Sequence, residues 1–483
     1  MNKTNHLGRV LSLLLLTWLL CLGMYGLPDS LFGLKLRRVD LLSDFCIAHE
    51  TTSLDSLRKQ LTESFIDSVY VDSVALQDSL QCVEKMDSAR IALRDSLYKV
   101  LYAVNGADSL GLRIEDYSLG HIGLKRFFTA LRNKEQLGRP VRIAFLGDSF
   151  IEGDIMVADI RSKLQQKFGG RGVGFVPIYS VAAQYRPTVH SQSSGWITKS
   201  ILTDRKHAYT LSGMFFDSET SIATLQIKSS ERYQELKSAS SLKFIYEQND
   251  STQLNLMLNV TDTLRELLPP TKQIIQQEWK GEISEADFLF EGALGLRALG
   301  VVLEDNEGVI VDNFSLRGNS GMVLAQLDSS RCREWNQIRP YDLIVLQYGL
   351  NVASDSVLNY GWYGAHMVKV INHLQCCFPE SDLLLLSVSD RSRQTERGIE
   401  TMPAVLALLY AQRQIARRTG IPFWNMFGAM GGENSMVNYV KNNWASKDYT
   451  HLSFRGGGKI AEAFLKALLV EKEYYDEMEK IYK

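Results

Sequence analysis

The sequence lacks a dominant charge and has little histidine. Its 53 lysine and arginine residues nearly balance its 55 aspartate and glutamate residues, which leaves a formal net charge of -2. A nucleic-acid-binding protein would be expected to carry a basic patch or a strongly basic domain, so we exclude that class. Only eight histidines occur, and their spacing shows no pairing typical of a metal site. We therefore predict neither a metal nor a cofactor.

Cysteine is also scarce, and its positions exclude a disulfide framework. Outside the first 28 residues the cysteines are Cys46, Cys82, Cys332, Cys376 and Cys377. Their number is odd, and their spacing fits no zinc motif. The adjacent pair lies in a helical pattern, so we expect one of its thiols in the core and the other at the surface.

A long apolar run, 10–27, lies near the N-terminus. It follows Lys3 and Arg9 and ends at Pro28. A charged start before such a run is typical of an export signal, and this run is about as long as the shortest membrane-spanning helices. We predict a signal peptide or an uncleaved signal anchor over 1–28. The protein should then be periplasmic or otherwise extracytoplasmic, and anchored to the inner membrane by this segment.

A helical region is expected over 29–115. Between 51 and 101, apolar residues recur at helical spacing with Asp-Ser pairs between them. The pattern fits a stalk or coiled coil that holds the rest of the chain away from a membrane. It fits equally well a helical hairpin packed on the main domain, because the heptads are irregular.

From residue 141 onward, short apolar runs alternate with helical patterns. Near-continuous apolar runs indicate strands covered on both faces, and hence a parallel sheet with helices on each side. The sequence therefore predicts an α/β fold. The expected strands are 141–147, 309–315, 341–349, 382–388 and 421–427. The expected helices are 321–335, 361–377, 402–419 and 455–483.

The segment between the predicted strands 141–147 and 309–315 is far longer than the dozen or so residues that a crossover between parallel strands needs. Within it, 186–305 contains stretches that alternate apolar and polar residues, separated by polar turns. This pattern is typical of an antiparallel β-sandwich. We predict an inserted β-rich domain over 186–305, flanked by the two parts of the main domain, 116–185 and 306–483.

Residues with useful chemistry follow three of the predicted strands. Ser149 follows the first strand in GDS and precedes a segment expected to be a helix. Gly318 follows the second strand in RGNSG, and Asn351 follows the third in YGLN. The carboxyl ends of parallel strands meet at one edge of the sheet, where ligands bind in open α/β folds. Near the C-terminus, Asp448 stands three residues before His451 in DYTH.

These residue types fit nucleophilic catalysis. A serine hydroxyl becomes a good nucleophile when a histidine takes its proton, and the histidine needs an acceptor on its other nitrogen. Ser149, His451 and Asp448 could fill these roles. The oxyanion that forms on an attacked ester needs convergent donors, which the backbone N–H groups of Ser149 and Gly318 and the amide of Asn351 could supply.

The four blocks, in this order, resemble the SGNH/GDSL hydrolase superfamily. The resemblance covers roughly 141–185 and 306–475. It implies a three-layer α/β/α sandwich with carboxyl-ester hydrolase activity, in which 116–185 and 306–483 form the catalytic domain. The insertion, the export signal, GDSFIEGDI and FGGRGVGFVP are similar to the bacterial cell-envelope branch of peptidoglycan O-acetylesterases. The inserted module of that branch is similar to carbohydrate-binding sandwiches.

The expected function is therefore an exported serine esterase that removes O-acetyl groups from peptidoglycan or another acetylated polysaccharide. A polysaccharide O-acetyltransferase with the same triad is the alternative, since a sugar hydroxyl can replace water as the acceptor. A transferase would need a membrane partner that supplies acetyl groups. A glycan-binding protein with a vestigial site is a third hypothesis, which the intact set of Ser149, Asp448 and His451 argues against.

Overall fold

The computed structural model describes residues 113–182 and 185–482, the short stretches 30–31 and 34–35, and residues 96 and 99. The predicted export segment and nearly all of the predicted helical region therefore lie outside the described residues. Contacts divide the chain into Met1–Glu84 and Lys85–Lys483. In the first unit, β1 (Ser30–Leu31) pairs with β2 (Leu34–Lys35). Within the described part of the chain, no helix is both long enough and apolar enough to span a membrane.

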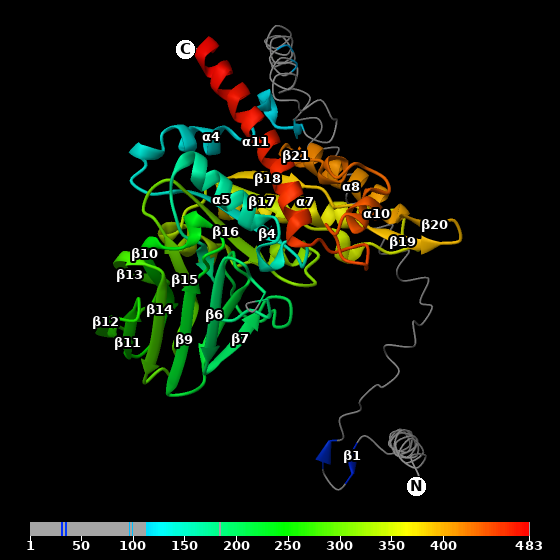
Figure 1. Ribbon diagram of the computed structural model, residues 1–483. Coiled ribbons are helices and arrows are strands. Elements are labelled where there is room, and N and C mark those ends of the chain that lie inside the picture. The colour runs from blue at the N-terminus through cyan, green and yellow to red at the C-terminus, as the bar shows by residue number, and fades with distance from the viewer. Residues whose placement is uncertain are drawn as a thin grey trace, which may run out of the picture. The chain divides into compact units, whose positions relative to one another are not determined.

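The second unit is built around a six-stranded sheet in the order β16-β4-β17-β18-β21-β3 (Figure 1). Five strands are parallel, and β3 joins the edge antiparallel to β21. The parallel sheet predicted from the sequence is confirmed. The strands are β16 (Val309–Ser315), β4 (Val141–Gly147), β17 (Leu343–Gln347), β18 (Asp382–Leu386), β21 (Pro422–Trp424) and β3 (Ile114–Asp116).

Helices cover both faces of this sheet, which gives the predicted three layers. On one face α11 contacts both α4 and α5, and on the other α7 packs against α6 and α8. The helices are α4 (Lys125–Arg132), α5 (Val157–Phe168), α6 (Ser329–Ile338), α7 (Gly361–Cys377), α8 (Pro403–Thr419), α9 (Met426–Ala429), α10 (Ser435–Lys441) and α11 (Phe454–Tyr482). A continuous core joins sheet and helices.

Short elements complete this part of the chain. The 3₁₀ helices are η1 (Leu119–His121), η2 (Lys134–Gln136), η3 (Glu152–Asp154), η4 (Gln234–Leu236), η5 (Met322–Gln326) and η6 (Leu350–Val352). A hairpin, β19 (Ser392–Thr395) and β20 (Gly398–Thr401), follows β18. Cys377 is buried and Cys376 is exposed, as expected for the adjacent pair.

Three elements differ from the sequence prediction. The helix expected directly after Ser149 begins only at Val157, because Asp154 and Met156 have left-handed backbone angles that interrupt a helix. The helix expected over 321–335 is divided into η5 and α6, because the side chain of Asp328 caps a new helix start. Finally, β3 includes two residues of the range 29–115, which we expected to be helical.

The segment between β4 and β16 forms the predicted antiparallel β-sandwich. One sheet has the order β13-β10-β15-β8-β7, with β5 also paired to β15, and the other has the order β12-β11-β14-β9-β6. Because β5 belongs to the first sheet, the sandwich takes a strand from before residue 186. Its strands are β5 (Gly174–Val176), β6 (Val189–Ser194), β7 (Trp196–Ser200), β8 (Met214–Ser218), β9 (Ile222–Ser229), β10 (Ala239–Glu247), β11 (Thr252–Leu258), β12 (Asp262–Leu268), β13 (Ile275–Ile283), β14 (Glu285–Glu291) and β15 (Arg297–Glu304).

The sandwich has its own core and also a buried junction with the α/β domain. Phe244, Phe288 and Phe290 pack within the sandwich. At the junction, the rings of Phe175 in β5 and Phe314 in β16 lie 4.9 Å apart between centroids. Since these contacts are buried, the sandwich is fixed to the strand that ends beside the candidate site.

Candidate active site

Ser149 lies in the turn that follows β4. The strand ends at Gly147, and a Cβ at that glycine would lie 2.5 Å from the Ile151 side chain. The missing side chain therefore lets the chain turn tightly under Ser149. Every residue of β4 is buried, so the strand is a rigid support that holds the serine at the carboxyl edge of the sheet.

The three predicted catalytic residues come together at this edge. The Ser149 Oγ lies 3.3 Å from the Nε2 of His451, and the His451 Nδ1 lies 2.7 Å from the Asp448 Oδ2. Asp448 and His451 occupy the loop before α11, which the bridge between Ala445 and Leu452 closes. The distances are those that a nucleophile, its base and the base's acceptor require.

The Asp448 carboxylate is held by the backbone of its own loop. Its Oδ1 accepts the N–H groups of Thr450 and His451, each at 3.0 Å. Partial burial alone would raise the pKa of Asp448, but hydrogen bonds from the His451 ring and from these two N–H groups lower it below its ordinary value. The carboxylate is therefore ionised at neutral pH and can stabilise an imidazolium at His451.

Gly318 presents its backbone to open space beside this group. Its φ of +77° is a left-handed angle that favours glycine, and a Cβ there would meet nothing within 4 Å. Among the described residues, neither the N–H of Ser149 nor that of Gly318 meets a hydrogen-bond acceptor. Both donors are thus free to bind an oxyanion.

Asn351 lies close to Ser149, but unlike these two N–H groups its side-chain amide already has hydrogen-bond acceptors. Its Nδ2 donates to the Asp148 Oδ2 at 2.8 Å and to the backbone oxygen of Asn319 at 3.0 Å. An amide nitrogen carries two hydrogens, so both are used. Asn351 can donate to an oxyanion only if it releases one of these acceptors.

Asp148 is a functional candidate that the sequence analysis missed. Its side chain is buried and its Oδ1 accepts the N–H of Phe150 at 2.8 Å. Burial disfavours the charged form and raises the pKa of Asp148 to about 6, although the donors at Phe150 and Asn351 and the charge of His451 oppose that rise. Its position directly before Ser149 in GDS is the signal that could have identified it.

Asn319, next to Gly318, was missed as well. It is fully buried, and its Oδ1 accepts the N–H of Gly321 at 2.8 Å. Its backbone oxygen holds Asn351. Asn319 therefore links the turn that carries Gly318 to the amide of Asn351, and the RGNSG motif contained it.

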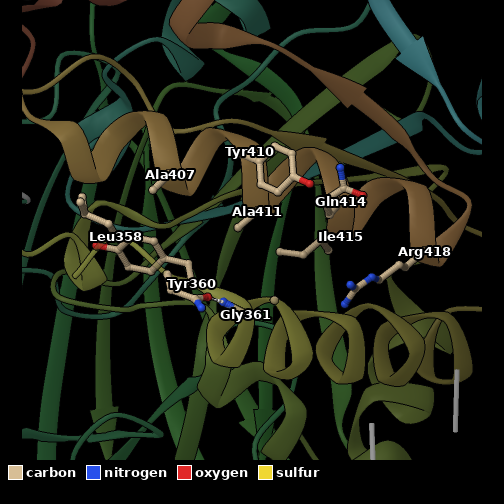
Figure 2. A pocket seen from close by; sticks show the side chains of 11 residues that line it. Leu358, Tyr360, Gly361, Ala407, Tyr410, Ala411, Gln414, Ile415 and Arg418 are labelled. Atoms are coloured by element: carbon tan, nitrogen blue, oxygen red, sulfur yellow. Dashed lines mark hydrogen bonds between the residues drawn. The ribbon is translucent and has the colours of Figure 1, made fainter. Parts of the chain in front are cut away.

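A groove of about 420 Å³ between α7 and α8 lies elsewhere (Figure 2). Tyr360 and Gly361 border it on one side, and Tyr410 and Ile415 on the other. None of the predicted site residues lines it. In the described ranges, no group of three or more His, Cys, Asp or Glu side chains is placed to bind a metal ion.

Comparison with known proteins supports the fold. No family model and no curated protein sequence matches the chain. Among solved structures, it is similar to a peptidoglycan O-acetylesterase, with a TM-score of 0.60 and 20% identity over 74% of this chain and 99% of that one. At this identity the likeness shows the fold, an α/β/α domain with an inserted sandwich. The predicted resemblance to SGNH/GDSL hydrolases is confirmed at that level.

Two further structures are less similar. One is a family two carbohydrate esterase from Cellvibrio japonicus, with a TM-score of 0.26 and 8% identity over 60% of this chain and 99% of that one. The other is an acetyl xylan esterase, with a TM-score of 0.26 and 15% identity over 33% of this chain and 81% of that one.

Proposed function

We propose that this chain is a serine esterase that removes O-acetyl groups from a polysaccharide. The observation that carries the proposal is the hydrogen-bonded series of Ser149, His451 and Asp448, with 3.3 Å and 2.7 Å between successive side chains. Such a series makes a hydroxyl nucleophilic. The similar fold of a peptidoglycan O-acetylesterase supports an acetyl ester as the group attacked.

In the first half-reaction, Ser149 Oγ attacks the carbonyl carbon of the acetyl ester while His451 Nε2 takes the hydroxyl proton. The carbonyl oxygen becomes an oxyanion, which the N–H groups of Ser149 and Gly318 stabilise. Asp448 accepts the Nδ1–H of the imidazolium. When the tetrahedral intermediate collapses, the bond to the sugar oxygen breaks, and the sugar leaves as a hydroxyl with the proton from His451.

In the second half-reaction, water attacks the acetyl group on Ser149. His451, neutral again, takes a proton from the water and returns it to the serine oxygen as the ester bond breaks. Acetate leaves, and the starting state is restored. No cofactor takes part in either half.

A polymeric substrate is supported by the β-sandwich. The sandwich is fixed to β16 through buried contacts such as that between Phe175 and Phe314, and β16 leads directly to Gly318. A rigid domain beside an active site gives a long polysaccharide additional surface to bind, whereas an acetyl group alone needs only the triad. This arrangement supports a carbohydrate-binding role for 186–305.

We also propose that the chain acts outside the cytoplasm, on an envelope glycan, and that 1–28 tethers it to the inner membrane. The support is the apolar run 10–27 behind Lys3 and Arg9. Fractionation of cells that express the full chain tests this: it should be found with inner membranes and should be digested by protease added to the periplasmic side.

The activity is tested with the full chain on 4-nitrophenyl acetate, acetylated xylan and O-acetylated peptidoglycan, measuring free acetate and acetylated acceptor separately. Free acetate should dominate, and Ser149→Ala should reduce its release by several orders of magnitude. Ser251→Ala, an exposed serine in the sandwich, serves as the control. Acetylated acceptor formed as fast as free acetate would instead support a transferase that works with a membrane partner.

A further inference from the structure

A small polar pocket lies beside the candidate active site and has no part in the proposed reaction. It measures about 40 Å³. Residues 152–154 and 313–315 of the α/β domain line one side, and Ser180, Arg186 and Ser212, from segments that border the sandwich strands, line the other. The pocket therefore lies where the two parts of the molecule meet.

The pocket is close to the reacting groups along the chain and in the fold. Glu152 follows Ser149 by three residues, and Ser315 precedes Gly318 by three. The N–H of Leu316 donates to the backbone oxygen of Gly147 at 2.9 Å, so the ends of β16 and β4 are held together. The pocket therefore lies next to the two turns that carry Ser149 and Gly318.

One carboxylate in the pocket wall, that of Asp154, forms ion pairs with two arginines. The Asp154 Oδ2 lies 3.0 Å from the Arg161 Nη1 and 2.9 Å from the Arg186 Nε, and the hydroxyl of Thr188 and the amide of Asn313 also donate to this carboxylate. All of these side chains are buried. One negative charge thus balances two positive ones, which leaves a guanidinium without a matching charge.

Arg186 is the arginine that remains unsatisfied. The residue is 9% exposed and lines the pocket. Its Nη2 is buried and has no hydrogen-bond partner among the described residues. A buried donor of this kind costs free energy unless an acceptor meets it, so the pocket presents a ready site for an acceptor group from outside the protein.

A second carboxylate, that of Glu152, lines the pocket together with Asp154. Glu152 is buried and pairs with Arg317, whose side chain is 64% exposed and which stands directly before Gly318. Arg161 and Arg317 are thus the partners of the two lining carboxylates. Counted with these partners, the pocket has three guanidinium groups against two carboxylates, which leaves Arg186 as the cation without a carboxylate of its own.

We propose that this pocket binds a carboxylate carried by the acetylated glycan, with Arg186 as its buried donor and Arg317 as a second cation nearby. The inference rests on the proposed esterase function and names its substrate class, an acidic polysaccharide. A guanidinium binds a carboxylate through charge-assisted hydrogen bonds and distinguishes it from a neutral group of similar size. Tyr185, which precedes Arg186 and is exposed, offers a ring face for the adjoining sugar.

The test compares acetylated polygalacturonate with the same polymer after methyl esterification, and uses 4-nitrophenyl acetate as the small substrate. The full chain should have a kcat/KM about tenfold or more higher on the free acid, since a hydrogen bond to a charged group supports a difference of that size. Arg186→Gln should remove this preference mainly through KM. Its activity on the other two substrates should fall far less than its activity on the free acid, because neither of them presents a carboxylate to the pocket.

The matched control is Arg265→Gln, which removes an exposed arginine from β12 of the sandwich and should leave the preference intact. Equal rates of the unaltered chain on both polymers would overturn the proposal, and so would an equal loss by Arg186→Gln on all three substrates. Failure of the unaltered chain to release acetate from any of them would contradict the esterase function itself, which is a distinguishable result.

A second measurement does not depend on how well the Arg186 variant folds. Calorimetric titration of Ser149→Ala with trigalacturonate and with its methyl ester should give a dissociation constant about tenfold or more lower for the acid, and the difference should shrink as salt rises. Equal affinity for the two ligands at low salt would overturn the proposal.

Discussion

At the scale of single residues, Asp148 makes the candidate site sensitive to pH. Its carboxyl accepts from Phe150 and from Asn351, and only the ionised form can accept from both without offering a competing proton. Burial raises its pKa to about 6. Asp148 is therefore ionised at neutral pH and takes up a proton just below it.

This titration predicts the shape of the pH profile. Activity should fall as the pH drops through about 6, because neutral Asp148 no longer stabilises the positive charge that His451 acquires when it takes the serine proton. The acid side of a plot of log kcat/KM against pH should therefore include the titration of Asp148.

Asp148→Asn provides the comparison for this profile. It removes the titrating carboxyl, so its acid limb should be less steep than that of the unaltered chain, on a lower maximum. Steady-state rates on 4-nitrophenyl acetate between pH 4 and 8 measure both chains. Acid limbs of equal steepness in the two chains would show that Asp148 does not control the reaction.

Asn351→Ala tests whether its amide reaches the oxyanion. We expect kcat to fall by about a hundredfold with little change in KM, because the loss of one oxyanion donor typically costs about 3 kcal/mol. Ser251→Ala again serves as the control. An increase in KM alone would instead make Asn351 a residue that binds the ground state.

These contacts explain why the sequence predicted only part of the site. Ser149, Gly318, Asn351, Asp448 and His451 were found because each stands in a short motif at the end of an element. The bond between Asp148 and Asn351 joins residues 203 apart, and the raised pKa arises from burial that only the folded chain creates. The sequence pattern alone reveals neither this hydrogen bond nor this pKa shift.

At the scale of elements, the strands that were predicted best are those with continuous apolar runs. The predicted strands 141–147 and 309–315 correspond to β4 and β16 residue for residue, because burial on both faces leaves an uninterrupted signal. The start of α5 was misplaced, since Gly153, Asp154 and Met156 adopt left-handed angles that tertiary contacts impose. A short edge strand such as β3, with three residues, carries too little pattern to be recognised.

The start of α11 depends on a glycine that permits close packing behind the His451 loop. A Cβ at Gly456 would lie 1.9 Å from the backbone oxygen of Trp444, so Gly456→Ala should displace the helix or the loop. We expect a loss of several kcal/mol in the free energy of unfolding, about the upper range for a core substitution, measured by urea denaturation.

Gly458→Ala in the same helix is the matched control. A Cβ there would meet the side chain of Asp159 at 3.3 Å, a flexible neighbour, and alanine favours a helix over glycine by about 1 kcal/mol. This variant should be neutral or slightly more stable. Equal losses at both positions would mean that the approach of Trp444 does not set the helix start.

At the scale of the whole molecule, buried charges join the sandwich to the α/β domain. Glu304 at the end of β15 is fully buried and meets Arg142, Lys243 and Arg339, each at 2.8 Å. Burial alone would raise the pKa of Glu304, but these three cations hold it well below its usual range. Because the two parts share this cluster, deletion of 186–305 would leave charges of the α/β domain unpaired.

Glu304→Gln should therefore destabilise both parts together. Removal of one partner from a buried ion pair typically costs about 3–5 kcal/mol, and here three cations lose their shared carboxylate. The loss should be full at neutral pH and shrink in acid, because a depressed carboxyl pKa contributes stability that disappears as the pH falls. Urea denaturation should show a single transition, and the exposed Glu219→Gln should have no effect.

In the proposed reaction Ser149, activated by His451 and Asp448, forms a covalent acyl-enzyme. Mass spectrometry of the full chain after treatment with a serine-reactive fluorophosphonate detects this nucleophile by the bond that it forms. A single adduct should map to the peptide that contains Ser149, and Ser149→Ala and His451→Ala should remain unlabelled while folding normally. An adduct on a different serine, or an unlabelled chain that still releases acetate from esters, would contradict the assignment of Ser149 as the nucleophile.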